Sequence, residues 1–345
     1  SRIDSGFTIF YIGINLGAFL AGMTAGYIRE AIGWWASFAV ASGGLVVGLA
    51  TFLYAIRYID DPHPHMSEHK SKFTFFIYCL LAIAGISFLF TMHRLTDWLL
   101  PSLGIALLFY LGYLSLQQEP IARNRLLLLT ALIVSSVIFW MIYLQMFFSA
   151  NLFVERLVNR NIFGLHLSNT IFWASESVFI ILLGPLFAWG WHVLSRENRN
   201  PSYMNKFIIG IFFAGLGMLV LGLSTYLPDS EGLVHPAFIF GAYLLITIGE
   251  LFLSPIGLSA VTILSPSHLT GMMMGIWFVA IGFGGVFAGV IAKMASVPNK
   301  VDESIDMLGI YRHAFLDFAW LAFFVAISLF FISLAIKKLA SPGRD

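Results

Sequence analysis

The apolar segment from about Ala237 to Leu264 constrains this chain most, because it is long enough to cross a lipid bilayer and carries an acid near its centre. A membrane-crossing helix needs roughly 20 predominantly apolar residues. Glu250 lies at this depth, where an acid costs about 2.5–3.5 kcal/mol to insert. Such acids usually face a cavity and mark an ion or substrate path. We therefore expect a ligand or proton site at Glu250, the alternative being an acid satisfied by a partner helix.

The residues around Glu250 fit a functional helix. Ser254 follows four residues later and lies on the same helical face. Pro255 removes a backbone donor and is expected to bend the helix there. Gly249 and Gly257 permit close approach of a neighbouring backbone or a ligand.

Hydropathy predicts an all-α polytopic membrane protein. The chain is 59% hydrophobic and 11% charged, whereas soluble domains carry roughly 25% charged residues. About ten apolar segments can be drawn. They cover about 7–28, 34–57, 73–92, 98–117, 126–149, 171–193, 207–227, 237–264, 270–295 and 314–336.

Charge predicts the orientation and excludes several classes of function. With a cytoplasmic N-terminus, the 19 Lys and Arg residues divide twelve to seven in favour of the inner connections, which predicts that both ends are cytoplasmic. The net charge of +1, without a basic run, gives no sign of a nucleic-acid partner. Cys79 is the single cysteine, so neither an intrachain disulfide nor a cysteine metal site is expected. No enzyme motif is present, and the His- and Pro-rich connection 58–72 reads as a solvated linker, with metal binding the alternative.

Further polar residues at membrane depth are candidates for a site. Glu176 is the second buried acid: burial disfavours the charged form of a carboxyl group, so it suits proton exchange or a ligand ammonium, and a structural acid is the alternative. Tyr11 and Asn15 share one helical face and must hydrogen-bond a ligand or another helix. Gln145 lies near the outer half of its segment and fits either role. Trp277, among glycines, fits a pocket wall or plain packing.

Several runs together resemble the proton-dependent oligopeptide transporter family. The run from Phe7 to Gly17 contains a Phe-Tyr-x-x-Ile-Asn-x-Gly pattern that resembles the family's fifth helix. Four further runs resemble the tenth, eleventh, seventh and eighth helices: they are Gly249–Ser259, Gly271–Phe278, Phe139–Gln145 and Ile180–Ala188. The segments 73–92 and 98–117 match the extra pair of helices that bacterial members insert between their two halves. On this resemblance, we expect the chain to begin just before the fifth helix.

The resemblance implies a major facilitator fold that imports di- and tripeptides with protons across the bacterial inner membrane, without a cofactor and as a monomer. The expected division is 1–58 for two helices of the N-terminal bundle, 59–124 for a cytoplasmic linker with two inserted helices, and 125–345 for the C-terminal six-helix bundle. Substrate-binding roles carry over to Tyr11, Asn15, Gln145, Glu250, Ser254 and Trp277. Glu250 would receive the peptide amino terminus, and Trp277 would wall a side-chain pocket.

Two departures from the family pattern affect the coupling residue. The usual acid on the seventh helix is Leu144 here, and the usual Gln-Ser-x-Asn-Pro of the eighth helix reads Trp173-Ala174-Ser175-Glu176-Ser177. We hypothesise that Glu176 takes over part of the missing carboxylate's work, so that Glu176 and Glu250 couple transport to protons. A carrier for another zwitterionic or anionic solute, or a non-transporting membrane sensor or scaffold, is the alternative.

Overall fold

The computed structural model describes residues 2–58, 72–91, 93–162, 164–197, 199–297 and 304–340, which are almost entirely helical. The chain packs into two compact units. The larger comprises Ser1–Gly26 with Leu114–Asp345, and the smaller comprises Tyr27–Tyr113.

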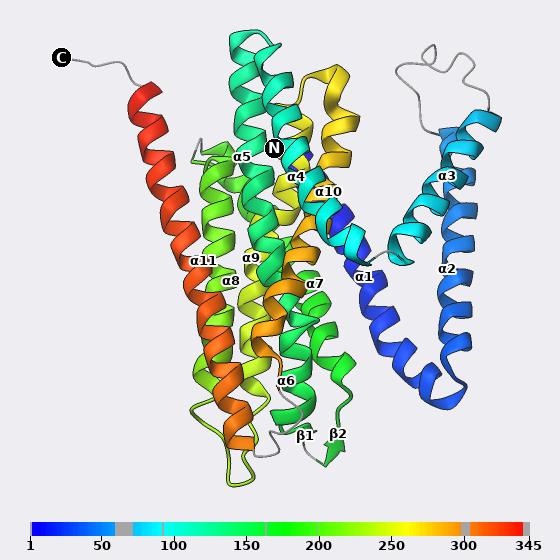
Figure 1. The fold of residues 1–345 in the computed structure, drawn as a ribbon, viewed down its shortest axis with the longest axis vertical. Coiled ribbons are helices and arrows are strands. Elements are labelled where there is room, and N and C mark those ends of the chain that lie inside the picture. The colour runs from blue at the N-terminus through cyan, green and yellow to red at the C-terminus, as the bar shows by residue number, and fades with distance from the viewer. Residues whose placement is uncertain are drawn as a thin grey trace. The chain divides into compact units, whose positions relative to one another are not determined.

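The larger unit is a bundle of long helices that run side by side (Figure 1). Its helices are α1 (Arg2–Ala31, as far as Gly26), the end of α4 (His93–Leu116), α5 (Pro120–Tyr143), α6 (Ser149–Leu157), α7 (Asn169–Arg196), α8 (Tyr203–Ser224), α9 (Ala237–Leu264), α10 (Thr270–Ala292) and α11 (Ser304–Ala340). Single 3-10 turns lie at Leu144–Met146, Ser267–Leu269 and Lys293–Ala295. A short antiparallel hairpin of β1 (Asn161–Ile162) and β2 (Leu165–His166) precedes α7.

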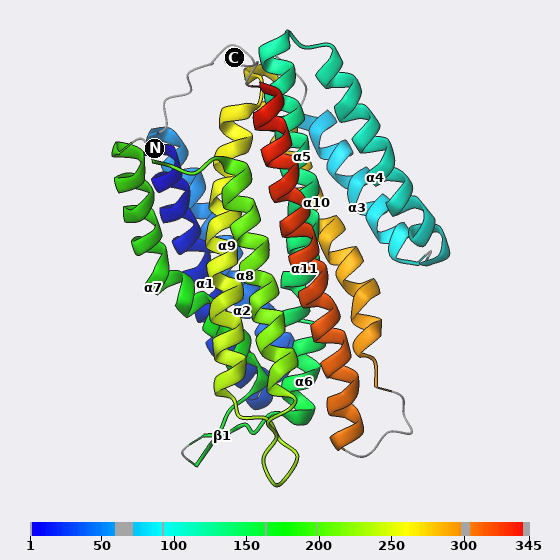
Figure 2. The same ribbon diagram turned by 90° about the vertical axis from the view of Figure 1, so that its left-hand side faces the viewer.

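Glycines set the spacing of the three central helices, in which α8 lies between α9 and α11 (Figure 2). A Cβ atom built on Gly210 of α8 would lie 2.8 Å from the carbonyl oxygen of Gly249, and one on Gly249 would lie 2.5 Å from that of Gly210. On the other side of α8, a Cβ on Gly215 would lie 2.8 Å from the Ala322 side chain. Small residues let membrane helices approach closely and gain dispersion contacts in place of a hydrophobic driving force. Glu250 therefore directly follows Gly249, the residue of α9 whose backbone is held closely against α8.

The helices confirm the predicted all-α membrane architecture. In the described parts of the chain, eight helices are long and apolar enough to cross a membrane, and the stretches Ile9–Ala25 and Phe76–Phe88 are shorter apolar helices. Each of the ten predicted segments overlaps a helix. The region 150–170, expected to be only a connection, also contains most of α6 and the β1–β2 hairpin.

The smaller unit contains the end of α1, then α2 (Trp34–Ala55), a 3-10 turn at Ile56–Tyr58, α3 (Lys72–Thr91) and most of α4. Gly33 makes the turn between α1 and α2 with a φ of 116°, a left-handed conformation that favours glycine. The apolar side chains of the smaller unit are largely exposed, as suits helices in lipid. Residues 59–71 of the His- and Pro-rich connection lie outside the described residues, and the three-part division at 58 and 124 stays a prediction.

The contact between Gly210 and Gly249 gives the first testable prediction. Gly249→Ala forces a methyl group against a backbone carbonyl, so we expect it to lower the free energy of unfolding by about 1–3 kcal/mol. Gly241→Ala in the same helix is the matched control, because a Cβ there meets nothing within 4 Å, and it should be neutral or stabilising. Thermal unfolding in detergent measures both. Equal melting of Gly249→Ala and the unsubstituted protein would contradict this packing.

Candidate functional site

Glu250 lies at the centre of α9 and is 1% exposed. Its Oε1 accepts a hydrogen bond from the hydroxyl group of Tyr11 in α1. Ser254, one turn further along α9 on the same face, is also buried. The second oxygen, Oε2, is buried without a hydrogen-bond partner among the described residues. The carboxyl group thus has one oxygen held and one oxygen available to a proton or a ligand.

Glu176 in α7 brings a second carboxyl group to the same place. It is 5% exposed, and its Oε1 accepts a hydrogen bond of 2.8 Å from the hydroxyl group of Tyr143, the last residue of α5. The carboxyl groups of Glu176 and Glu250 interact with each other. Two carboxyl groups, each bonded to a phenol from another helix, therefore meet inside the bundle.

Asn15 connects α1 to α7 beside this pair. Its Nδ2 donates to the carbonyl oxygen of Tyr11 over 3.0 Å, and its Oδ1 lies 3.5 Å from the hydroxyl oxygen of Ser177, at the limit of a hydrogen bond. Asn15 and Ser177 are both buried. The polar face predicted for Tyr11 and Asn15 thus turns toward α7 and α9, where the two acids lie.

Trp173 and Gly184 form further contacts between α1 and α7. A Cβ on Gly22 of α1 would lie 3.2 Å from both the Trp173 ring and Ala174, so the indole occupies the space that the glycine leaves open. A Cβ on Gly184 of α7 would lie 2.9 Å from the Ile12 side chain. Trp173, which replaces the glutamine of the family pattern, therefore packs against α1 on one side of the acids, and Gly184 lies on the other.

Gln145 belongs to an interruption of a membrane span. The span from Pro120 to Leu157 is broken by the 3-10 turn at Leu144–Met146. The Nε2 of Gln145 donates to the carbonyl oxygens of Met141 (3.1 Å) and Ala288 (3.0 Å), and its Oε1 accepts from Ser149 (2.7 Å). Both donors of the amide are thus engaged in holding the interruption and tying it to α10. Contact with a substrate stays a prediction, and it would require these bonds to be exchanged.

Tyr243 completes the same interruption, because its hydroxyl group donates to the carbonyl oxygen of Met146 over 3.2 Å. Backbone groups inside a membrane need such partners, since lipid supplies none. The interruption directly follows Tyr143, the residue that bonds Glu176. The acid pair and the broken span are therefore adjacent.

Trp277 lies in the packed interior in this structure. It is 1% exposed, and its indole meets the Phe207 ring edge-on, with centroids 6.1 Å apart. The indole also fills the space beside Gly257, where a Cβ would lie 2.1 Å from the ring. A side chain at this position would overlap the indole, which explains why residue 257 of α9 is a glycine. The role of Trp277 as a pocket wall stays a prediction.

The structure thus brings Tyr11, Asn15, Glu176, Glu250 and Ser254 into one cluster. Sequence reasoning missed Tyr143, whose only local signal was its position in an aromatic run two residues before Gln145. Within the described ranges, no group of three His, Cys, Asp or Glu side chains could hold a metal ion.

Comparison with known proteins identifies the family. The model of the POT family matches residues 1–310. The chain is 30% identical over 332 residues to peptide transporter YePEPT of Yersinia enterocolitica subsp. palearctica, which covers 89% of this chain and 64% of the relative. It is 27% identical over 343 residues to dipeptide and tripeptide permease B of Xenorhabdus bovienii, covering 96% of this chain and 69% of that protein.

Solved structures agree. The crystal structure of peptide transporter POT in complex with sulfate superimposes with a TM-score of 0.72 at 26% identity, over 97% of this chain and 68% of that one. A tetrameric crystal structure of PepTSo2 gives a TM-score of 0.76 at 25% identity, over 98% of this chain and 72% of that one. The chain belongs to the POT family, a family of transporters, and it is a multi-pass membrane protein. It spans about two thirds of the length of the curated relatives it matches.

The hydrogen bonds of Gln145 predict a structural effect. Gln145→Ala leaves the Ala288 carbonyl group and the Ser149 hydroxyl group buried with one partner fewer, which we expect to lower the free energy of unfolding by about 2–3 kcal/mol. Thermal unfolding in detergent measures the change, and Gln117→Ala, at an exposed glutamine, is the control. A variant as stable as the control would show that the amide does not hold the interruption.

Proposed function

We propose that the whole protein is a carrier that imports di- and tripeptides together with protons across the bacterial inner membrane by alternating access. Its membership of the POT family and the names of its relatives, which are peptide transporters and a dipeptide and tripeptide permease, support the peptide substrate. The observation that carries the proposal is the buried pair of Glu176 and Glu250, with their phenol partners from α5 and α1. A transporter needs such a site to hold a charge at membrane depth and to release it.

The acid pair suits proton binding. Two negative charges a few ångströms apart repel strongly where the local dielectric constant is low. Two carboxyl groups that share a site therefore titrate as one unit. We propose that Glu176 and Glu250 together bind one proton, and that the hydroxyl groups of Tyr11 and Tyr143 hold the carboxyl groups in place in both protonation states.

The same site suits a zwitterionic peptide. Its ammonium group needs a fixed anion, and its backbone needs small polar partners. Glu250 supplies the anion through Oε2, while Ser254 and Asn15 supply the polar groups. An arriving ammonium group can balance the charge that the departing proton leaves behind. Proton and peptide are coupled in this way because they share one carboxyl group.

Orientation and assembly belong to the same proposal. We place both ends in the cytoplasm because the inner connections carry the excess of Lys and Arg. The monomer is the proposed transport unit, because the acid pair and its partners all come from one chain. PepTSo2 has been crystallised as a tetramer, and each subunit of such an assembly would carry its own site.

A second solute class is favoured by one observation. Glu176 is an additional acid in the cluster, coupled electrostatically to Glu250, where the family pattern has an asparagine. A cluster with this extra acid also fits a zwitterionic or cationic group other than a peptide amino terminus. Uptake assays that include amino acids and small amines beside peptides distinguish the two.

Glu250→Gln tests the proposed site. We expect gradient-driven uptake of a labelled dipeptide into proteoliposomes to be abolished, because the amide can neither carry the anion nor exchange the proton. Asp317→Asn is the matched control, since Asp317 lies on α11 with its side chain exposed, and it should transport normally. Unchanged uptake by Glu250→Gln would refute the site, and no uptake of any di- or tripeptide by the unsubstituted protein would refute the substrate.

Glu176→Gln and Tyr143→Phe separate proton coupling from peptide binding. Glu176→Gln should keep peptide counterflow, which needs no proton gradient, and lose gradient-driven accumulation. Tyr143→Phe removes a hydrogen bond to the acid, worth about 1.5–3 kcal/mol, and should slow accumulation at least about tenfold. Accumulation by Glu176→Gln at the normal rate would exclude a coupling role for this residue.

A further inference from the structure

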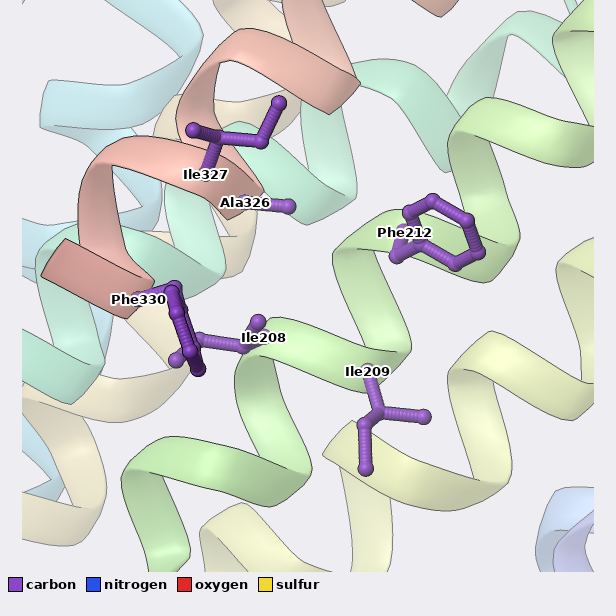
Figure 3. A pocket seen from close by; sticks show the side chains of 6 residues that line it. All are labelled: Ile208, Ile209, Phe212, Ala326, Ile327 and Phe330. Atoms are coloured by element: carbon purple, nitrogen blue, oxygen red, sulfur yellow. The ribbon is translucent and has the colours of Figure 1, made fainter. Parts of the chain in front are cut away.

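Two hollows in the larger unit differ in their chemistry. The groove between α8 and α11 is lined by six apolar side chains, among them Phe212, Ile327 and Phe330 (Figure 3), so nothing in it selects a ligand by charge. The second hollow is a polar pocket of about 390 Å3 at the other end of α8. Small-molecule sites typically measure about 300–1,000 Å3, so a small solute fits this pocket. The charged residues that line it are Glu155, Arg156, Arg160 and Glu231.

The walls of the polar pocket are held in place by the backbone. They are formed by the end of α6, the β1–β2 hairpin and the connection between α8 and α9, which lie at the same end of the bundle (Figure 1). The N–H group of Val234 donates to the carbonyl oxygen of Leu157 over 2.7 Å, and that of Asn159 donates to the carbonyl oxygen of Val234 over 3.0 Å. Within the connection, Oδ1 of Asp229 accepts from the backbone N–H group of Glu231 over 2.9 Å. A pocket built in this way loses little conformational freedom when a ligand binds.

The polar pocket carries two charges of each sign. Arg156 lies in the last turn of α6 and Arg160 directly precedes β1, whereas Glu231 lies in the α8–α9 connection. The Nη1 of Arg160 donates to Oδ1 of Asn169 over 3.0 Å, which fixes the guanidinium group and leaves further N–H groups for a ligand. Among the residues that the structure describes, neither arginine forms an ion pair with Glu155 or Glu231. The four charges can therefore bind ionic groups of a solute.

We propose that the polar pocket binds a zwitterionic dipeptide, whose carboxylate lies against Arg156 and Arg160 and whose ammonium group lies against Glu231. The mixed charges favour this ligand, because a simple anion would be repelled by the glutamates and a simple cation by the arginines. Guanidinium groups bind carboxylates through paired, parallel hydrogen bonds.

This inference rests on the proposed function, since a dipeptide is the zwitterion that the carrier would import. In the proposed orientation, the end of the bundle with the polar pocket faces the outside of the cell. The pocket would therefore raise the concentration of peptide at the surface from which uptake begins.

Phenylglyoxal, which modifies arginine side chains, tests the pocket when the modified residues are located by peptide mass spectrometry. Alanyl-alanine should slow modification of Arg156 and Arg160 at least about threefold, because a bound carboxylate occupies their N–H groups. The same protection is expected in Glu250→Gln, in which the central site is disabled. Arg199, which is 77% exposed at the other end of the bundle, is the control within the same sample and should react at an unchanged rate. N-acetyl-alanyl-alanine amide, which has no charge, should protect neither arginine.

Glu231→Gln tests the contact with the ammonium group. It should raise the alanyl-alanine concentration for half-maximal protection about twofold to fivefold, which is the range for one exposed ion pair. Protection by N-acetyl-alanyl-alanine, which carries the carboxylate alone, should not change. Asp306→Asn is the matched control, because it makes the same change of charge at an exposed acid outside the pocket, at the start of α11.

Four outcomes would overturn the proposal. Absence of protection by alanyl-alanine would refute the pocket, and protection that disappears in Glu250→Gln would assign the effect to the central site. Protection by the uncharged dipeptide would refute recognition by charge. An equal shift in Glu231→Gln and Asp306→Asn would refute the ammonium contact. Uptake assays decide the proposed function separately: uptake with unprotected arginines refutes only the pocket, and protection without uptake refutes only the carrier.

Discussion

The structure depends on keeping a carboxyl group buried in the middle of a membrane helix. An acid at this depth is costly unless polar groups surround it, and Tyr11 of α1 supplies such a group to Glu250. The position of Glu250 is also fixed by its neighbour Gly249, whose backbone lies against Gly210 of α8. Glycine packing on one face of α9 therefore fixes the position of the acid that faces α1.

In our account, conformation and protonation are linked through α1. Tyr11 bonds Glu250, Asn15 lies beside Ser177, and Gly22 receives Trp173, so α1 contacts the acids and flanks them. A movement of α1 away from α7 and α9 would break the phenol contact and open Glu250 to water or substrate. On the other side, Tyr143 joins Glu176 to the broken span held by Gln145. The acid pair thus lies between α1 and the broken span, the two elements that would move in the alternating access we propose.

The sequence was sufficient to predict the membrane helices, because hydropathy and length decide which segments cross a bilayer, and both acids expected to be buried are buried. The contacts of those helices were harder to predict. A membrane helix has apolar side chains on every face. Hydrophobic periodicity therefore does not show which neighbouring helix the side chain of Trp277 or Tyr143 contacts. The interruption at Leu144–Met146 has no proline or glycine to signal it, and its bonds to Ala288 and Tyr243 join residues far apart in the chain. Family resemblance pointed to Gln145, but only the packed helices show which groups its amide holds.

Infrared difference spectroscopy of the membrane-embedded protein tests the central claim most directly, because a protonated carboxyl group has its own carbonyl band. We predict one such band that shifts or disappears when a dipeptide is added, and that is lost in Glu176→Gln or Glu250→Gln. A spectrum in which the dipeptide leaves every protonated-carboxyl band unchanged would contradict a proton site shared with the substrate.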